Sequence, residues 1–195
     1  GALYVDQRAE STVFCDRNLD LMTSFAGQIA VALENAFLYE ELNDKQRIEQ
    51  ELDIANRIQA RLLPKEIPEV PGIEVYGRMI PAGKVGGDYY DFIFDEETRN
   101  LTLCIGDVSG KGVPGGLVMV MARVLLHHFD VARLSTREIL LRANEILKAN
   151  TEPFIFMSMI LLKWESDSNR LTYTGAGHEN LLIHRLADRE VEVVP

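Results

Sequence analysis

Residues from about 20 to 63 carry a hydrophobic pattern typical of a long amphipathic helix. No Gly or Pro occurs from Gln28 to Leu63, so a continuous helix over these 36 residues would reach about 54 Å. Apolar positions alternate at spacings of three and four, as in a coiled coil, at Met22, Phe25, Ile29, Ala32, Ala36 and Tyr39. A second stripe, out of register with the first, runs through Ile48, Leu52, Ala55 and Leu62.

The change of register has two explanations. Either one helix changes partner near residue 43, or the segment forms two helices. Each stripe alone also fits an ordinary amphipathic helix packed on a core. Two different partners account for two registers, so the pattern favours a helical linker between domains over residues 23–63.

Beyond Pro64, Pro68 and Pro71 the pattern changes to short runs that predict mainly strands. We expect strands at about 73–79, 88–94, 101–107, 156–164, 171–175 and 180–185, and a short one at 2–5. One helix should open at Pro114 and, being apolar on nearly every face, should be covered on two sides. Another should begin at Ser135, which forms a capping box with Glu138. Strands in hairpin-like runs with helices grouped between them predict an α+β fold.

Composition narrows the class of protein. Hydrophobic residues make up 47% and charged residues 26%, as in an ordinary globular chain. The net charge of −10 argues against nucleic acid as the main partner. Two cysteines, Cys15 and Cys104, form no disulfide framework and favour a reducing cytoplasm. No export signal is visible and no stretch approaches the ~20 apolar residues of a membrane span, so we expect no membrane association.

Two acidic residues are predicted to meet at one end of the sheet. Asp88 follows a pair of glycines and begins one strand, whereas Asp107 ends the next, in CIGDVSGKGVPGG. If 88–94 and 101–107 pair as a hairpin, both carboxylates lie at the same sheet end. Two adjacent carboxylates repel each other unless a cation neutralises them or one takes a proton. Hard divalent ions with oxygen ligands, Mg²⁺ or Mn²⁺, suit such a pair.

Other motifs in the same region are weaker. A Walker A loop would need Gly at 105 and Ser or Thr at 112, where the chain has Ile105 and Gly112. The run 110–115 matches G-x-G-x-x-G, but the acid expected about twenty residues later is missing. A Ser109/His178/Asp88 triad is conceivable, although a nucleophile elbow would need Gly at 107.

The four histidines favour structural explanations. None of them has a zinc-ligand spacing with the cysteines. His127 and His128 lie near a helix C-terminus, where partial positive charge is favourable. His178 follows the tight turn Gly175–Gly177. The favoured interpretation is a hairpin whose backbone groups His178 caps, and the alternative is a place near the acidic site.

Taken together, VGGDYYDF, IGDVSGKGVPGGLVM, ANEIL and YTGAGHENLLI, in this order, resemble a known family. They resemble the bacterial metal-dependent serine/threonine phosphatases of the PPM superfamily, in the branch of the stage II sporulation protein E and the sigma-factor-regulating phosphatases. The lead-in ANRIQARLLP resembles the same branch, so the likeness covers about residues 55–195. Residues 1–40 look like the tail of a GAF sensor domain running into its exit helix.

The resemblance implies two stacked antiparallel sheets flanked by helices, here incomplete, with a dinuclear Mn²⁺/Mg²⁺ site at one end. Asp107 matches the family's bridging carboxylate, the carbonyl of Val108 the neighbouring ligand, and Asp88 the acid of the second metal. Lys111 could attract phosphate, although a solvated loop lysine is at least as good an interpretation. The implied domains are a GAF remnant (1–22), the helical linker (23–63) and the N-terminal part of a PPM domain (64–195).

The chain also departs from the family pattern. The family's later Thr-Asp-Gly segment and further Asp, both metal ligands, do not occur before the chain ends at VEVVP. We therefore expect weak metal affinity and little turnover from this chain. Gly115 and Gly116 stand where relatives usually carry alanines, which should loosen the first turn of that helix.

The main hypothesis is a cytoplasmic phosphatase that dephosphorylates a regulatory phosphoprotein, of the anti-sigma-factor antagonist type. An upstream sensor would control it through the 20–63 helix, in a parallel homodimer. Two alternatives remain open: a non-catalytic dimerisation and signal-transfer module, and a nucleotide-binding domain.

Overall fold

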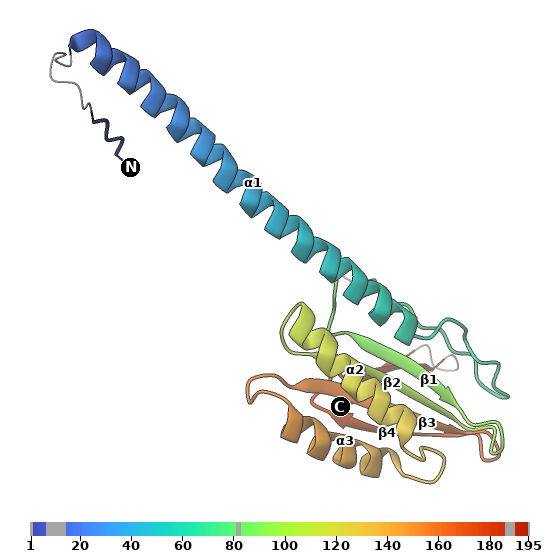
Figure 1. Cartoon of the computed structure of the whole chain (residues 1–195). Helices are drawn as coiled ribbons and strands as arrows, with labels where there is room; N and C mark the ends of the chain where they lie inside the picture. The colour runs from blue at the N-terminus through green and yellow to red at the C-terminus, as the bar shows by residue number, and fades with distance from the viewer. Residues whose placement is uncertain (1, 7–14, 81–82, 186–189, 195) are drawn as a thin grey trace. The chain divides into compact units, whose positions relative to one another are not determined.

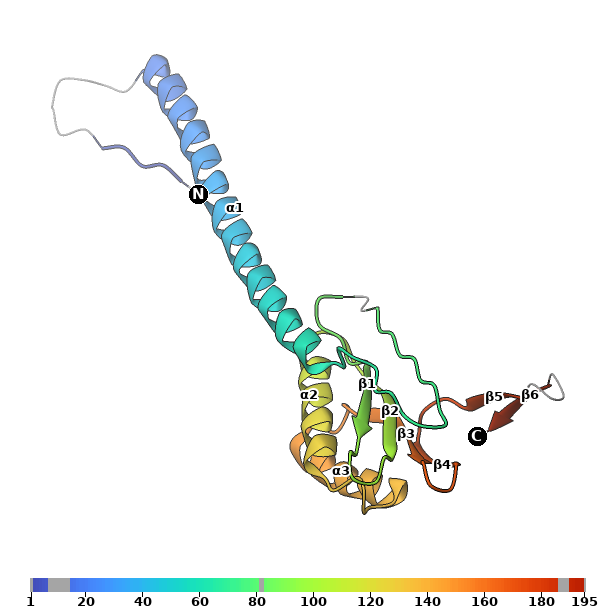
Figure 2. The same cartoon turned by 90° about the vertical axis from the view of Figure 1, so that its right-hand side faces the viewer.

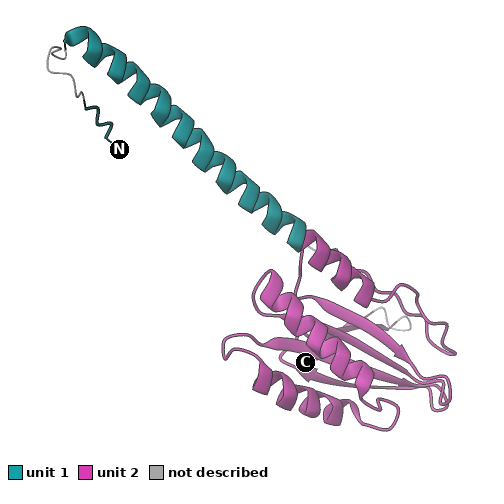
Figure 3. Ribbon diagram, in the orientation of Figure 1, with its two compact units in different colours: residues 1–51 teal, residues 52–195 magenta. Residues whose placement is uncertain are grey.

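The computed structural model describes residues 2–6, 15–80, 83–185 and 190–194. The chain divides into two compact units, residues 1–51 and residues 52–195 (Figure 3). Each unit is described by itself below.

The first unit consists mainly of helix α1 (Asp16–Leu62), a single helix of 47 residues whose last turns belong to the second unit. The two-helix explanation of the register change is therefore wrong. The first apolar stripe is largely open to solvent, with Phe25 47% and Tyr39 69% exposed. Residues 2–5 form no strand, contrary to expectation, because an isolated extended segment has no neighbour to complete its backbone hydrogen bonds. Residues 7–14 of the predicted GAF remnant lie outside the described residues.

The last turns of α1 pack within the second unit. Leu52, Ala55 and Leu62 are half-buried there, and Gln59 is buried among them. Ile48, the first residue of the second stripe, stays 53% exposed. The second stripe thus packs within the second unit, and its contact begins one turn later than the sequence pattern does.

The second unit is built on a four-stranded antiparallel sheet of order β1-β2-β3-β4 (Figures 1 and 2). The strands are β1 (Tyr89–Phe94), β2 (Leu101–Val108), β3 (Met157–Glu165) and β4 (Arg170–Ala176). A separate two-stranded antiparallel sheet pairs β5 (Leu181–Arg185) with β6 (Glu190–Val194). Five strands fall close to their predicted positions, whereas β6 was not predicted.

Two helices cover one face of the four-stranded sheet (Figures 1 and 2). Helix α2 (Val113–His128) has Pro in its first turn, and α3 (Thr136–Asn150) begins with the predicted Ser135–Glu138 capping box. The core between helices and sheet is formed by Tyr89, Cys104, Val108, Val118, Met119, Ala122, Leu126, Ile139, Met159 and Leu161. The α+β prediction is confirmed. Helix α2 packs on the sheet and against α3, as expected, but one of its faces stays open, with Leu117 60% and Val124 56% exposed.

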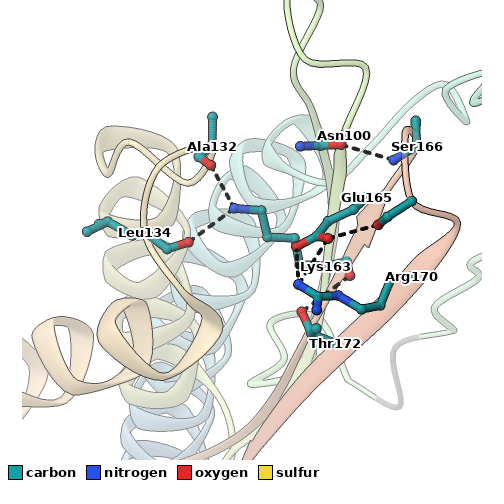
Figure 4. A network of polar contacts seen from close by, with 9 residues as sticks. Asn100, Ala132, Leu134, Lys163, Glu165, Ser166, Arg170 and Thr172 are labelled. Atoms are coloured by element: carbon teal, nitrogen blue, oxygen red, sulfur yellow. Dashed lines mark hydrogen bonds and ion pairs between the residues drawn. The ribbon is translucent and has the colours of Figure 1, made fainter.

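A buried lysine fastens the connection between α2 and α3 to the sheet. Lys163 in β3 is only 8% exposed, and its Nζ donates hydrogen bonds to three main-chain carbonyls, of which those of Ala132 and Leu134 are labelled in Figure 4. The acceptors are Val131 at 2.9 Å, Ala132 at 2.7 Å and Leu134 at 3.2 Å. These bonds give a donor to main-chain carbonyls of the loop that joins the two helices.

The strand expected at 73–79 is absent. Residues 73–80 alternate between half-buried and exposed, as the sequence pattern predicts, but only Val70 and Ile73 form an isolated bridge. A Cβ at Gly77 would lie 2.7 Å from the Tyr90 ring, so the main chain runs directly against aromatic side chains. The alternation therefore reflects packing and not strand pairing.

Candidate metal centre

The β1–β2 hairpin brings Asp88 and Asp107 together. Tyr89 pairs with Gly106 in the antiparallel register, so the next position outward aligns Asp88 with Asp107. Asp88 keeps contact with solvent, yet partial burial and the neighbouring Asp107 carboxylate raise its pKa above the usual value. The predicted convergence of two carboxylates at this sheet end is present in the structure.

Gly87 allows the main chain to approach the end of β2 closely. A Cβ at residue 87 would lie 2.9 Å from the Val108 carbonyl oxygen and 3.0 Å from the Val108 Cβ. A larger residue would push the segment before Asp88 away from Val108. The glycine pair of VGGD thus places Asp88 beside the strand end that carries Asp107 and the Val108 carbonyl.

His178 lies at the same site. Ser158 is the β3 residue paired with Asp107, and its Oγ is 2.9 Å from His178 Nδ1 and 3.4 Å from the Asp107 carbonyl oxygen. His178, Asp88 and Asp107 line one cavity of about 520 Å³. Its other walls include the apolar side chains Tyr90, Phe92, Leu103, Ile105 and Leu162. Of the two interpretations of His178, the structure supports the place near the site.

The oxygen donors at this sheet end suit a hard divalent cation. Two carboxylates and a neighbouring main-chain carbonyl offer only oxygen, and Mg²⁺ commonly binds one or two carboxylates while keeping several waters. Among the described residues, no cluster of three or more Asp, Glu, His or Cys side chains could hold a metal ion. The residues therefore fit Mn²⁺ or Mg²⁺ as a partial ligand set, with water completing the coordination.

The structure supports neither the catalytic triad nor the dinucleotide-binding loop that the sequence left open. Ser109 is held by main chain: Phe156 N donates to its Oγ at 2.9 Å, while its own N donates to the Phe156 carbonyl at 2.8 Å. His178 instead bonds Ser158, so the structure does not assemble the conceivable Ser109/His178/Asp88 triad. The dinucleotide interpretation of residues 110–115 fails on topology, because β3 returns antiparallel to β2 and no parallel βαβ unit forms there. Lys111 is exposed on the loop.

Gly116 has a packing role that the sequence did not reveal. It is buried in α2, and a Cβ there would lie 2.3 Å from Val85 Cγ1 and 3.2 Å from Gln59 Nε2. At Gly115 the nearest atom to an added Cβ is the Gly110 carbonyl oxygen at 3.4 Å. The expectation that both glycines only loosen the helix is therefore incomplete, since Gly116 also lets α2 approach two other segments.

A second polar cluster, which sequence reasoning missed, lies on the helix-covered face of the hairpin. Asp91 is 3% exposed and accepts hydrogen bonds from Tyr89 Oη at 2.9 Å and Phe92 N at 2.8 Å. From α2, His127 Nε2 lies 2.7 Å and Arg123 Nε 3.5 Å from the Asp91 carboxylate. The sequence did contain one signal: Asp91 lies two positions after Tyr89 in the same strand, which places both side chains on the buried face. His127 is structural, as expected, but its partner is Asp91.

Comparison with known proteins adds a family. Residues 97–195 match the family model described as Stage II sporulation protein E (SpoIIE). "Phosphoserine phosphatase RsbU" of Bacillus subtilis (strain 168) is 30% identical over 135 residues, covering 69% of this chain and 40% of that protein. "Protein IcfG" of Synechocystis sp. is 33% identical over 108 residues, or 50% of this chain and 17% of that protein. The chain thus spans less than half the length of these curated relatives.

The fold likeness extends further than the sequence likeness. The solved SiaA-PP2C domain of Pseudomonas aeruginosa superposes with a TM-score of 0.59 at 22% sequence identity. The match covers 77% of this chain and 61% of that domain. At this level of identity the comparison establishes the fold, an incomplete PP2C-type arrangement of antiparallel sheet and helices.

Proposed function

Since the chain belongs to the Stage II sporulation protein E (SpoIIE) family, we propose that it is part of a metal-dependent protein serine/threonine phosphatase. The observation that carries the proposal is the placement of Asp88 against Asp107 at one end of the sheet. A similar protein is named a phosphoserine phosphatase, which supports the same reaction class.

The proposed roles follow from the chemistry of each group. Asp107 and the Val108 carbonyl would hold the ions, and Asp88 would hold one of them directly or through water. A bound pair of Mn²⁺ or Mg²⁺ ions would supply an acidified water for attack on phosphorus and would neutralise the phosphoryl oxygens. Metal binding would also relieve the repulsion that raises the pKa of Asp88.

The proposed substrate is a phosphorylated regulatory protein of the anti-sigma-factor antagonist type. The sequence resemblance to sigma-factor-regulating phosphatases supports it, and the negative charge of the chain gives no support to nucleic acid as a partner. Control would come from an upstream sensor through α1, in a parallel homodimer. The exposed apolar stripe of α1 supports that assembly, because a second copy would bury side chains such as Phe25 and Ile29.

We place the protein in the cytoplasm as part of this proposal. Helix α1 contains one 18-residue window with a mean hydropathy of 1.2, long and apolar enough to cross a membrane. That is weak evidence for a span, because helices of soluble proteins pass the same test, and the coiled-coil-like spacing of the first apolar stripe favours a helical partner.

The test is phosphate release from a phosphoserine protein in Mn²⁺, by the chain lengthened at its C-terminus to the family's full extent. Asp107→Asn should lower the rate at least about a hundredfold, because loss of residues that only support a metal ligand already costs 10–100-fold. Asp167→Asn, which alters an exposed acid of the β3–β4 turn, is the matched control and should leave the rate unchanged. Undiminished release by Asp107→Asn would refute the mechanism.

The exposed stripe of α1 also favours a second candidate, a non-catalytic dimerisation and signal-transfer module. A Mn²⁺ titration separates the two. A phosphatase site binds Mn²⁺ through Asp88 and Asp107, whereas the module shows no binding that depends on these residues.

A further inference from the structure

The last turns of α1 are hydrogen-bonded to the segment that leads into Asp88. Gln59 is only 5% exposed, and its amide makes two bonds to one residue of that segment. Its Nε2 donates to the Gly86 carbonyl at 2.6 Å, and its Oε1 accepts from the Gly86 N–H at 3.1 Å. A side-chain amide that pairs with both main-chain groups of one residue fixes that residue's position and orientation.

Two further side chains extend this contact along the same face of α1. Asn56 Nδ2 donates to the Lys84 carbonyl, and Asp53 lies 3.0 Å from Lys84 Nζ. The three residues 53, 56 and 59 are spaced three apart, which places them on one side of the helix. Asp53 and Asn56 both contact Lys84, and Gln59 contacts Gly86.

The same segment is closed in from its other sides. Val85 is buried, and the close approach of Gly116 in α2 leaves no room for a Cβ beside it. Gly87 is pressed against Val108 at the end of β2. Only Gly87 stands between Gly86 and Asp88, so a displaced Gly86 would change where the Asp88 carboxylate meets Asp107.

We propose that Gln59 is a positioning residue, which sets Asp88 against Asp107 by fixing the main chain of Gly86. This inference rests on the proposed function, since it treats Asp88 as a metal ligand. It goes beyond that function because it assigns to helix α1 a residue that positions a metal ligand. A bond that merely docked α1 would contribute to stability but would not alter the affinity of the site for a cation.

The test replaces Gln59 by Met, which keeps the volume of the side chain and removes both hydrogen bonds. Mn²⁺ binding is measured by calorimetry on the chain and on its lengthened form, at a temperature where circular dichroism shows the variant folded. We expect Gln59→Met to weaken Mn²⁺ binding about tenfold, the effect of losing about 1.4 kcal/mol of support. Asn56→Ala should weaken it less, and Gln50→Met, at an exposed position of the same helix, should leave it unchanged.

Amide hydrogen exchange supplies a readout that needs no metal. The Gly86 amide should be protected in the parent chain and should lose that protection in Gln59→Met. Rapid exchange of this amide in the parent chain, or unchanged Mn²⁺ affinity in Gln59→Met, overturns the proposal.

Asp107→Asn, run in parallel, keeps the two claims apart. If Asp107→Asn weakens Mn²⁺ binding and Gln59→Met does not, only the positioning role fails. If Asp107→Asn leaves Mn²⁺ binding intact, the proposed function fails and the positioning role with it, even where the Gly86 amide is protected.

Discussion

The β1–β2 hairpin carries two acidic sites, which differ in their burial and in the partners that the described residues supply. On the helix-covered face, Asp91 is buried and receives hydrogen bonds from Tyr89 and Phe92, with His127 and Arg123 beside it. At the open end of the same hairpin, Asp88 faces another acid, and the pKa of Asp88 is raised by burial and by Asp107.

The contrast separates a structural acid from a candidate ligand. The chain supplies the partners that Asp91 needs, so its negative charge costs little when buried. For Asp88 and Asp107, the described residues form no metal-binding cluster larger than the pair itself, and like charges that face each other reduce stability. A site that the protein leaves electrostatically unsatisfied is one that an external cation can complete.

The largest effect is expected from replacing Asp91, the acid whose partners the chain itself supplies. Asp91→Asn should lower the free energy of unfolding by about 3 kcal/mol, because it leaves the partly buried Arg123 guanidinium without its counter-charge. Urea unfolding measures this loss, and Mn²⁺ affinity of the folded variant should not change. Full stability in Asp91→Asn would remove the distinction between the two acids.

A second buried charge on the helix-covered face gives the next largest effect. Lys163→Met should cost about 2 kcal/mol, because the carbonyls of Val131, Ala132 and Leu134 lose their donor. Urea unfolding is again the measurement. Lys148→Met, at an exposed position of α3, is the matched control and should stay within about 0.5 kcal/mol of the parent. Equal effects of the two substitutions would contradict the fastening role of Lys163.

The smallest effect has the opposite sign. Since the pKa of Asp88 is raised in the folded chain, the stability that its protonated form contributes is present below the unfolded-state pKa and lost as the pH rises through the folded-state pKa. Asp88→Asn removes this loss, so in chelator at pH 7 the variant should be more stable than the parent. The gain should be only about 0.5 kcal/mol, because solvent screens the interaction between the two carboxylates.

Thermal unfolding in chelator between about pH 3.5 and pH 7 measures the effect of Asp88→Asn, and the stability of the variant should fall less with rising pH than that of the parent. Asp167→Asn should follow the parent. A variant less stable than the parent at pH 7 would show that the two carboxylates do not repel each other.

Features set by neighbouring residues could be read from the sequence. The strand expected at 101–107, the capping box of Ser135 and the hairpin between two adjacent strands each depend on residues a few positions apart, and each is present in the structure. The meeting of Asp88 and Asp107 followed from that hairpin alone. The candidate site was predictable because its two acids lie on strands that are consecutive in the chain.

Features set by distant partners could not be read in this way. Gln59 meets Gly86 across 27 positions, and Asp91 meets His127 across 36. Residues 73–79 show strand-like alternation, yet no ladder, because packing on Tyr90 and Phe92 produces the same period. In each case the amino-acid pattern was visible, but the partner that gives it meaning depends on the tertiary fold.

Crystals soaked in Mn²⁺ and measured at the manganese absorption edge test the central claim most directly. We expect an anomalous peak within about 2–2.5 Å of a carboxylate oxygen from both Asp88 and Asp107, and none beside Asp91. Crystals of the lengthened chain in which these two carboxylates turn apart into solvent, with no anomalous peak between them, would contradict the account.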